Sequence, residues 1–202
     1  MALLLLIRHG ETDWNRSGQI MGERPVPLNQ NGITQATRLA TRLSILTSPH
    51  LYASPMTRAK QTAEILTAAL RTTVNEEPDV REISMGQWEG RYWNEFDGHP
   101  ARRDWSISPK DARAPGGETL AEVQQRAVAA TVRLLGRKEK GPTLIVTHAD
   151  VIRTIVAHYL ETDLQTVRHM QIDHASVTAL AITESSGKLL CLNSLPDLNW
   201  LK

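Results

Sequence analysis

The sequence predicts a single-domain α/β fold: a three-layer α/β/α unit with a mostly parallel central sheet and an edge hairpin. Three observations support this. Residues 3–7 and 143–147 are continuous apolar runs, typical of strands buried on both faces. Patterns of helical period alternate with strand patterns along the chain, which favours a parallel sheet. A length of 202 residues with 41% apolar residues suits one domain, so we expect residues 1–202 to form one unit.

The first part of the chain supplies strands and helices in alternation. In order, we expect a strand at 3–7, a helix at 31–44, a strand at 50–53, a helix to about residue 70 and a strand at 72–76. The apolar face of the first helix carries Ile33, Ala36, Leu39, Ala40 and Leu43. Ser54 and Pro55 predict the start of the second helix, with the serine as N-cap and the proline at the first helical position.

The second part begins with an irregular stretch. Residues 77–117 are rich in proline, glycine and aromatic residues, and we expect this segment to cover the substrate. The elements expected here are a short helix near 97–105, a helix at about 119–137, a strand at 143–147, a helix at 150–160 and strands at 176–183 and 188–193. The last two strands alternate apolar and polar residues around Ser185-Ser186-Gly187, as in a hairpin at a sheet edge.

Both central strands end in a histidine. Arg8 and His9 follow the first strand, and His148 follows the second. Because ligands of open α/β sheets bind beyond the carboxyl ends of the strands, the two histidines predict one shared site. A neutral imidazole is a good nucleophile, and a neighbouring arginine can hold the oxygens of a phosphate. A packed core histidine is the commoner role for a single histidine, but the pair and the Arg-His-Gly context outweigh it.

Three further side chains can contribute to phosphate chemistry. Asn15 can donate to phosphate oxygens, and Arg58 lies in the first turn of a helix that follows a strand. A glutamic acid of raised pKa can protonate a leaving alkoxide, and Glu82 is the candidate, since it lies between apolar residues near Trp88. Glu89 competes for this role. Considered alone, each of Arg58, Glu82 and Glu89 would more commonly be a solvent-exposed charge or part of a surface salt bridge.

Together these motifs resemble the histidine phosphatase superfamily, also called the phosphoglycerate mutase-like family, and within it the small bacterial-type phosphatases. The resemblance covers nearly the whole chain. The matching motifs, in family order, are Arg8-His9-Gly10-Glu11-Thr12 with Trp14-Asn15, Ser54-Pro55 with Arg58-Ala59 and Gln61-Thr62-Ala63, Glu82 with Gly86-Gln87-Trp88-Glu89-Gly90, Gly116-Gly117-Glu118-Thr119, and Thr147-His148.

The resemblance implies a phosphohistidine mechanism that uses neither a metal nor another cofactor. His9 would attack phosphorus, and Glu82 would protonate the leaving alcohol and then activate water. Three residues would hold the equatorial oxygens: Arg8, Arg58 and His148. Further contacts to phosphate or substrate are expected from Asn15, Gln19, Gly22, Ala149 and Trp93.

Two features bear on substrate choice. Many members carry two glycines, or an alanine and a glycine, after the second histidine, whereas this chain has Ala149-Asp150. Asp150 either caps the following helix, which we favour, or faces the substrate and selects a cationic group. The segment 85–117 holds five of the nine aromatic residues, which either wall the leaving-group pocket or pack that segment onto the domain: Trp88, Tyr92, Trp93, Phe96 and Trp105.

The chain is compact, and Arg102-Arg103-Asp104-Trp105 lacks the rest of the inserted motif that the resemblance associates with mutases. We therefore expect a phosphatase of a small phosphomonoester, similar to α-ribazole phosphatase and the broad-specificity phosphatases. The alternatives are a cofactor-dependent phosphoglycerate mutase, a non-catalytic module that binds a phosphorylated ligand, and a metallohydrolase built from the histidines.

Composition limits the partners. A net charge of +1 gives no broad basic field for nucleic acid. The N-terminal apolar run is too short for a membrane span and lacks the basic residues of a signal peptide. Cys191 is the only cysteine, so intramolecular disulfides are excluded and we expect a cytoplasmic protein. The edge hairpin leaves the oligomeric state open, with a homodimer as one outcome.

Overall fold

One sheet organises the molecule. The computed structural model describes residues 1–108, 110–137, 140–183 and 186–195. In this part of the chain the strands follow the order β3-β2-β4-β1-β5-β6. Their bounds are β1 Ala2–Arg8, β2 His50–Ala53, β3 Val74–Glu76, β4 Thr143–Thr147, β5 Val177–Ile182 and β6 Gly187–Ser194. Strands β3, β2, β4 and β1 are parallel, and β5 and β6 add an antiparallel hairpin at one edge, as predicted.

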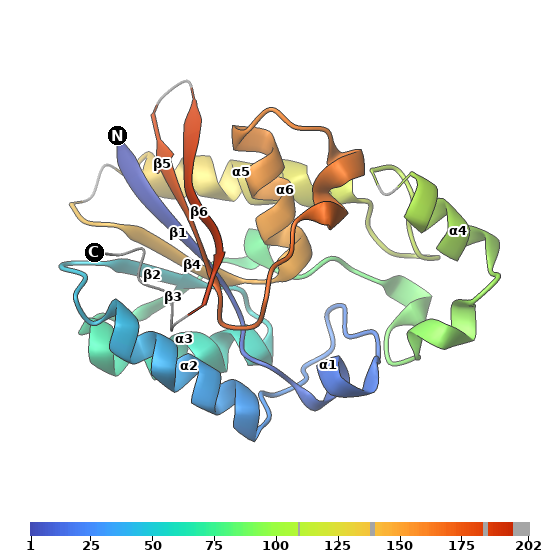
Figure 1. Cartoon of the computed structure of the whole chain (residues 1–202), viewed down its shortest axis with the longest axis horizontal. Coiled ribbons are helices and arrows are strands. Elements are labelled where there is room, and N and C mark those ends of the chain that lie inside the picture. The colour runs from blue at the N-terminus through green and yellow to red at the C-terminus, as the bar shows by residue number, and fades with distance from the viewer. Residues whose placement is uncertain (109, 138–139, 184–185, 196–202) are drawn as a thin grey trace.

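Helices cover both faces of the sheet (Figure 1). The pair α2 (Gln30–Leu43) and α3 (Thr57–Leu70) packs on one face, and the pair α5 (Leu120–Leu135) and α6 (Ala149–Tyr159) packs on the other. Strand β1 serves both cores because its side chains alternate: Leu5 and Ile7 face α2 and α3, whereas Leu4 and Leu6 face α5 and α6. The predicted three-layer single-domain fold is therefore confirmed.

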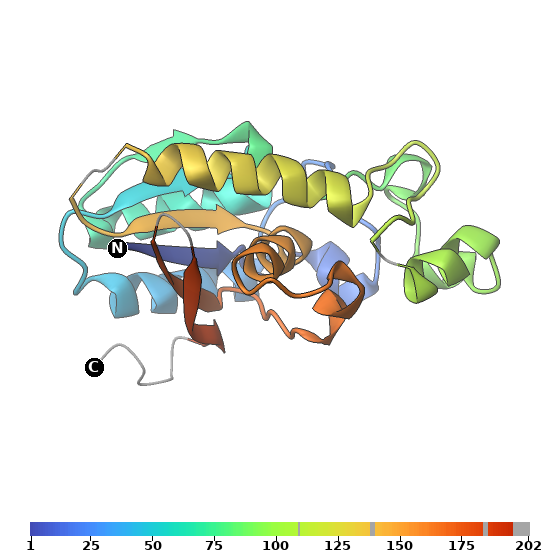
Figure 2. The same cartoon turned by 90° about the horizontal axis from the view of Figure 1, so that it is seen from above.

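Shorter helical segments gather at the carboxyl end of the parallel strands. They are α1 Asp13–Ser17, η1 Pro78–Val80, η2 Gly86–Trp88, η3 Trp93–Phe96, α4 Pro100–Ile107 and η4 Leu164–His169. Figure 2 shows α4 lying beyond the arrowheads of β1 and β4. The expected short helix near 97–105 is thus α4, and the rest of the irregular stretch is organised by three 3₁₀ turns and a buried aromatic cluster. None of the described helices is long and apolar enough to cross a membrane.

The predicted start of α3 is wrong. The helix begins at Thr57 with Met56 as N-cap, and neither Ser54 nor Pro55 belongs to it. The backbone N–H of Ser54 donates to Val146 O at 2.9 Å, so the chain stays extended after β2, and the serine hydroxyl is used elsewhere.

One residue of the predicted apolar face of α2 also points outward. Ile33 is 41% exposed, while Gly32 is buried in its place. A Cβ on Gly32 would lie 2.1 Å from Glu11 O, so the first turn of α2 approaches the loop after β1 through its backbone. This close approach rotates Ile33 toward solvent.

Candidate active site

The parallel pairing of β1 with β4 brings the two predicted histidines together. Arg8 is the register partner of Thr147, so His9 and His148 leave the sheet side by side, and His9 N–H donates to Thr147 O at 3.0 Å. Their ring centroids lie 5.1 Å apart. Both side chains are buried, which is unusual for polar groups without a chemical task.

His9 is held with one ring nitrogen ready to react. Its Nδ1 lies 2.7 Å from Gly10 O, and because a carbonyl only accepts, Nδ1 carries the proton. Nε2 therefore keeps its lone pair. Burial, followed by the charges of Arg58 and Arg8, lowers the pKa of His9 well below its ordinary value. The ring is thus neutral, and nucleophilic, across the physiological range.

Two buried arginines flank this imidazole. Arg8 Nη1 donates to Ile172 O at 2.6 Å, and Arg58 donates to Gly22 O at 2.8 Å and to Arg24 O at 3.1 Å. The Nε atoms of both arginines are buried without a hydrogen-bond partner among the described residues. Burial lowers the pKa of Arg8 to about 10 and lowers that of Arg58 as well. Backbone carbonyls thus fix two cations whose remaining donors suit an anion.

The carboxyl group of Glu82 lies next to the ring of His148. Its Oε1 accepts from Ile83 N–H at 3.0 Å, and its Oε2 is 3.6 Å from His148 Nδ1. Burial and the charge of Asp150 raise the pKa of Glu82 to about 7, although Arg58 and Arg8 oppose that shift. A carboxyl group with this pKa can give and take a proton near neutrality.

Glu82 is positioned by a hydrogen-bond network around Arg126 that the sequence did not predict. Arg126 of α5 donates to the carbonyl oxygens of Asp79, Arg81 and Glu82 at 2.8 to 3.2 Å, and forms two 2.9 Å bonds to Glu118. Glu118 also accepts from Ser84 N–H at 3.0 Å. The glutamate of the Gly-Glu-Thr motif therefore fixes the loop that carries Glu82. Only its motif membership hinted at this role.

Ser54 and Thr62 are two further residues whose roles the sequence did not reveal. Ser54 Oγ lies 2.7 Å from His148 Nε2, so Nδ1 of that ring faces Glu82. When Ser54 donates to Nε2, Nδ1 carries the proton and can itself donate. Thr62 Oγ1 accepts from Gly10 N–H at 3.0 Å and donates to Arg58 O at 2.7 Å, which ties the His9 loop to α3.

His174 is a third histidine at the site, and none of the sequence motifs includes it. Its ring centroid lies 5.9 Å from that of His9. Its Nε2 is buried without a hydrogen-bond partner in the described part of the chain. Burial and the charge of Arg8 lower its pKa to about 4. The only sequence signal was its position just before β5, the strand next to β1.

The five predicted secondary contacts have different environments. Asn15 Oδ1 accepts from Thr12 in a capping box of α1, which leaves the NH₂ end of the amide as the donor. Gly22 has φ +49° and offers its carbonyl to Arg58. Gln19 donates to Gly90 O at 3.3 Å and bridges to Tyr92, so its bonds join two loops.

The other two secondary residues lie in different parts of the fold. Ala149 is the first residue of α6, directly after His148. Trp93 is half-buried in η3, with its ring under the guanidinium of Arg102 at 4.6 Å. Trp93 therefore belongs to the aromatic segment 86–108. It is not part of the cluster at the strand ends, which consists of Arg8, His9, Arg58, Glu82 and His148.

The two carboxylates that the sequence left ambiguous have clear partners. Asp150 does not cap α6, because His148 is the N-cap, and its Oδ1 pairs with Arg153 Nη1 at 2.9 Å. The capping interpretation is therefore wrong. Glu89 accepts the N–H groups of Glu23 and Met85, both at 3.1 Å. These bonds give Glu89 a structural role in its loop.

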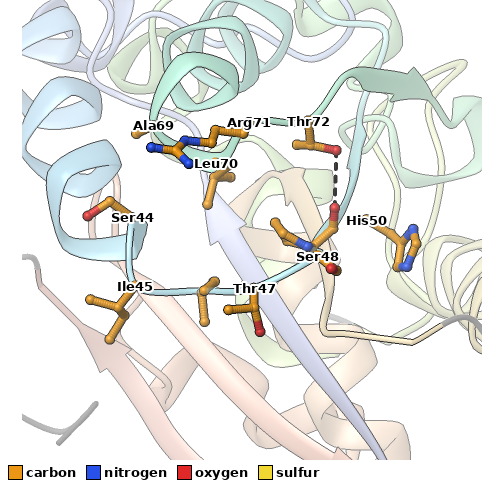
Figure 3. A pocket seen from close by; sticks show the side chains of 11 residues that line it. Ser44, Ile45, Thr47, Ser48, His50, Ala69, Leu70, Arg71 and Thr72 are labelled. Atoms are coloured by element: carbon orange, nitrogen blue, oxygen red, sulfur yellow. Dashed lines mark hydrogen bonds between the residues drawn. The ribbon is translucent and has the colours of Figure 1, made fainter.

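A metal is the remaining alternative for this cluster. His9, Glu82 and His148 offer ligand atoms within 4.8 Å of one another, the one such group among the described residues. Arg8 and Arg58, whose charges act on His9, disfavour a dication here and favour an anion. A cavity of about 740 Å³, lined by residues 44–50 and 69–72, lies at the opposite end of β2 and takes no part in the site (Figure 3).

A buried neutral imidazole between arginines, beside a carboxyl group of pKa about 7, defines a site for phosphoryl transfer. Residues 4–195 match the family model of the Histidine phosphatase superfamily (branch 1), and the chain belongs to that family.

Named relatives include both mutases and phosphatases. The chain is 30% identical over 187 residues to the probable phosphoglycerate mutase GpmB of Salmonella paratyphi C, covering 92% of this chain and 87% of that protein. The structure of a phosphoserine phosphatase mutant from Entamoeba histolytica, in complex with phosphoserine, is similar with a TM-score of 0.85 and 27% sequence identity. The match covers 96% of this chain and 98% of that one. The structure of a putative alpha-ribazole-5'-P phosphatase from Escherichia coli K-12 is similar with a TM-score of 0.85 and 28% sequence identity, and the match covers 96% of each chain.

Proposed function

We propose that this protein is a metal-independent phosphatase that hydrolyses a small phosphomonoester through a phosphohistidine on His9. The observation that carries the proposal is the state of His9: its Nδ1 proton is bound to Gly10 O, and its ring lies between Arg8 and Arg58. Neutral Nε2 is then the nucleophile, and the arginines neutralise the phosphoryl group that it attacks.

In the first step, Nε2 of His9 attacks phosphorus and the bond from phosphorus to the leaving oxygen breaks. Glu82, protonated because its pKa is about 7, gives its proton to that oxygen, and the alcohol departs. Arg8, Arg58 and the Nδ1–H of His148 hold the three equatorial oxygens. Asn15 supports the same oxygens through its amide NH₂.

In the second step, the ionised Glu82 takes a proton from water while that water attacks phosphorus. The bond between phosphorus and Nε2 breaks, phosphate leaves, and His9 and Glu82 return to their starting states. The 3.6 Å separation of Glu82 Oε2 from His148 Nδ1 leaves both groups near the same phosphoryl face. Neither step changes an oxidation state or requires a metal ion, because each consists only of phosphoryl and proton transfer.

The substrate class is a small phosphorylated metabolite. Named phosphatases among the similar structures, one of them bound to phosphoserine, make phosphomonoesters of small alcohols the first candidates. Gln19, Gly22, Ala149 and Trp93 are proposed to limit the space for the alcohol. We further propose a cytoplasmic setting, which suits a chain whose single cysteine cannot form an intramolecular disulfide.

A second candidate is a phosphoglycerate mutase, because the relative that is 30% identical carries that name. A mutase would return the phosphoryl group from His9 to another hydroxyl before water entered. Faster interconversion of phosphoglycerates than release of phosphate would establish this alternative.

The test is phosphate release from a panel of esters, with and without chelator, by wild type and His9→Ala. The panel contains p-nitrophenyl phosphate, 3-phosphoglycerate, phosphoserine, sugar phosphates and α-ribazole phosphate. Release that resists chelator and disappears in the variant supports the proposal. Release abolished by chelator would indicate a metallohydrolase, and tight binding without turnover would indicate a binding module.

A further inference from the structure

Buried polar atoms without a hydrogen-bond partner concentrate in two places in the described part of the chain. The first group surrounds His9: Arg8 Nε, Arg58 Nε, His148 Nδ1 and His174 Nε2. The second group lies where α4 meets η4: Trp105 Nε1, Gln165 Oε1 and Arg168 Nε. In the proposed function the unpaired donors of the first group contact an anion, and an anion could likewise satisfy the two donors of the second group, Trp105 Nε1 and Arg168 Nε, whereas Gln165 Oε1 is an acceptor and needs a donor.

Arg168 is the charged member of the second group. Its guanidinium lies 4.7 Å from the ring centre of Trp105, which is 1% exposed. Its Nε is buried and has no hydrogen-bond partner among the described residues. Stacking on an aromatic face costs a guanidinium none of its in-plane donors, so these stay available for a ligand.

A continuous stretch of chain links Arg168 to the catalytic cluster. After η4, Met170 O accepts from Arg153 Nε at 2.9 Å, and Ile172 O accepts from Arg8 Nη1 at 2.6 Å. His174 then approaches His9. Residues 168–174 therefore form one wall that runs from the phosphoryl site outward to Arg168.

The charges along this wall are unequal. Asp150 is neutralised by Arg153 at 2.9 Å, while Arg168 has no such partner in the described residues. Burial lowers the pKa of Arg168, the charges of Arg153 and Arg102 lower it further, and the charge of Asp150 opposes the shift. Arg168 therefore adds positive charge at the outer end of this wall.

We propose that Arg168, seated on Trp105, binds an anionic group, a carboxylate or a second phosphate, on the leaving alcohol. This inference rests on the proposed function for its orientation, because the phosphoryl group is taken to lie at His9. It narrows the substrate class to phosphomonoesters with a second negative group. A bidentate contact from the guanidinium would bind either kind of oxyanion.

The experiment compares matched esters. Glycerol 3-phosphate and 3-phosphoglycerate differ by a carboxylate, and glucose 6-phosphate and glucose 1,6-bisphosphate differ by a phosphate. We expect wild type to prefer the anionic member of at least one pair, and the pair that shows the preference identifies the group. In Arg168→Gln the ratio of kcat/KM within that pair should fall about tenfold, mainly through KM.

Three further variants keep the result interpretable. Arg103→Gln removes the same charge from an exposed position of α4 and should leave the ratio within twofold of wild type. Arg168→Lys keeps the charge but loses the fork, so its ratio should lie between those of wild type and Arg168→Gln. Asp150→Asn removes a negative charge near Arg168 and frees Arg153 from its ion pair, so it should raise the ratio. If Arg168→Gln does not fold, Arg168→Lys and Asp150→Asn decide the question.

Failure of this inference differs from failure of the proposed function. Turnover of both esters with equal ratios in wild type and Arg168→Gln would overturn the role of Arg168 and leave the phosphatase intact. If wild type released phosphate from no ester, calorimetric binding of each pair to His9→Ala would still test the inference. No preference for the anionic ester, or a preference that survives Arg168→Gln, would overturn it.

Discussion

The strand-end cluster and the aromatic cover are built in different ways. The strand-end cluster (Arg8, His9, Arg58, Glu82 and His148) is fixed by sheet register, backbone carbonyls and buried hydrogen bonds. The aromatic cover (the described residues of 86–108) consists of short turns held by ring contacts, such as the stacking of Trp88 on Phe96 at 4.4 Å. Under the proposed function, the chemistry would therefore depend on the fold, whereas the space for the alcohol would depend on local packing.

Removing the nucleophile should give the largest effect. His9→Ala is expected to lower kcat/KM about 10⁴-fold or more on every substrate, because the neutral Nε2 of His9 is the proposed nucleophile and Nε2 of the neighbouring His148 is already bound to Ser54 Oγ. Phosphate release measures this directly, and trapping of a ³²P-labelled acid-labile protein should fail in the variant. His158→Ala, at an exposed histidine of α6, is the matched control and should retain activity. Residual labelling in His9→Ala would mean that another group carries the phosphoryl.

The second largest effect should come from Glu82→Gln. A fixed carboxyl acid typically contributes 10²–10⁴-fold, so we expect a loss of about 10³-fold on alkyl phosphates. The loss on p-nitrophenyl phosphate should be smaller, because that leaving group needs less protonation. Glu89→Gln tests the rejected candidate and should lose far less, since its carboxylate is bound to backbone N–H groups.

The same residue should set the pH profile. Glu82 acts as an acid only when protonated, and its pKa is raised to about 7, so kcat/KM should fall as pH rises through about 7. The pKa of His9 is lowered well below 6.5, so protonation of the nucleophile should reduce the rate only at much lower pH. Glu82→Gln should lack the fall near pH 7. A wild-type profile that stayed flat to pH 9 would contradict this role.

A change behind the strand-end cluster should have an intermediate effect. Ser54→Ala leaves His148 Nε2 without its 2.7 Å partner, so the ring no longer has a fixed tautomer for donation from Nδ1. We expect kcat to fall about tenfold, with similar losses on all substrates. Ser44→Ala removes an exposed hydroxyl from the end of α2 and controls for the substitution itself. A loss confined to some substrates would place Ser54 in specificity and not in positioning.

The sequence predicted that His9 and His148 lie together because both follow continuous apolar runs. These runs mark β1 and β4, and the parallel register of the two strands brings the histidines to one point. Side-chain contacts between distant elements left no such signal. The sequence predicted Ser54 as a helix cap and gave no motif for His174 or Arg126, although each contacts the site or its supporting loop.

The smallest expected effects lie in the aromatic cover, and they separate packing from recognition. Phe96 is 4% exposed and stacks on Trp88, so Phe96→Ala should lower Tm and reduce activity equally on all esters. Trp93 is only half-buried, so Trp93→Ala should change the ratio of rates between bulky and small esters a few-fold with little change in Tm. Melting curves and kcat/KM for the ester panel measure both. If Trp93→Ala also lost activity equally on every ester, the cover would act by packing alone, and Arg168 would be left as the determinant of the alcohol.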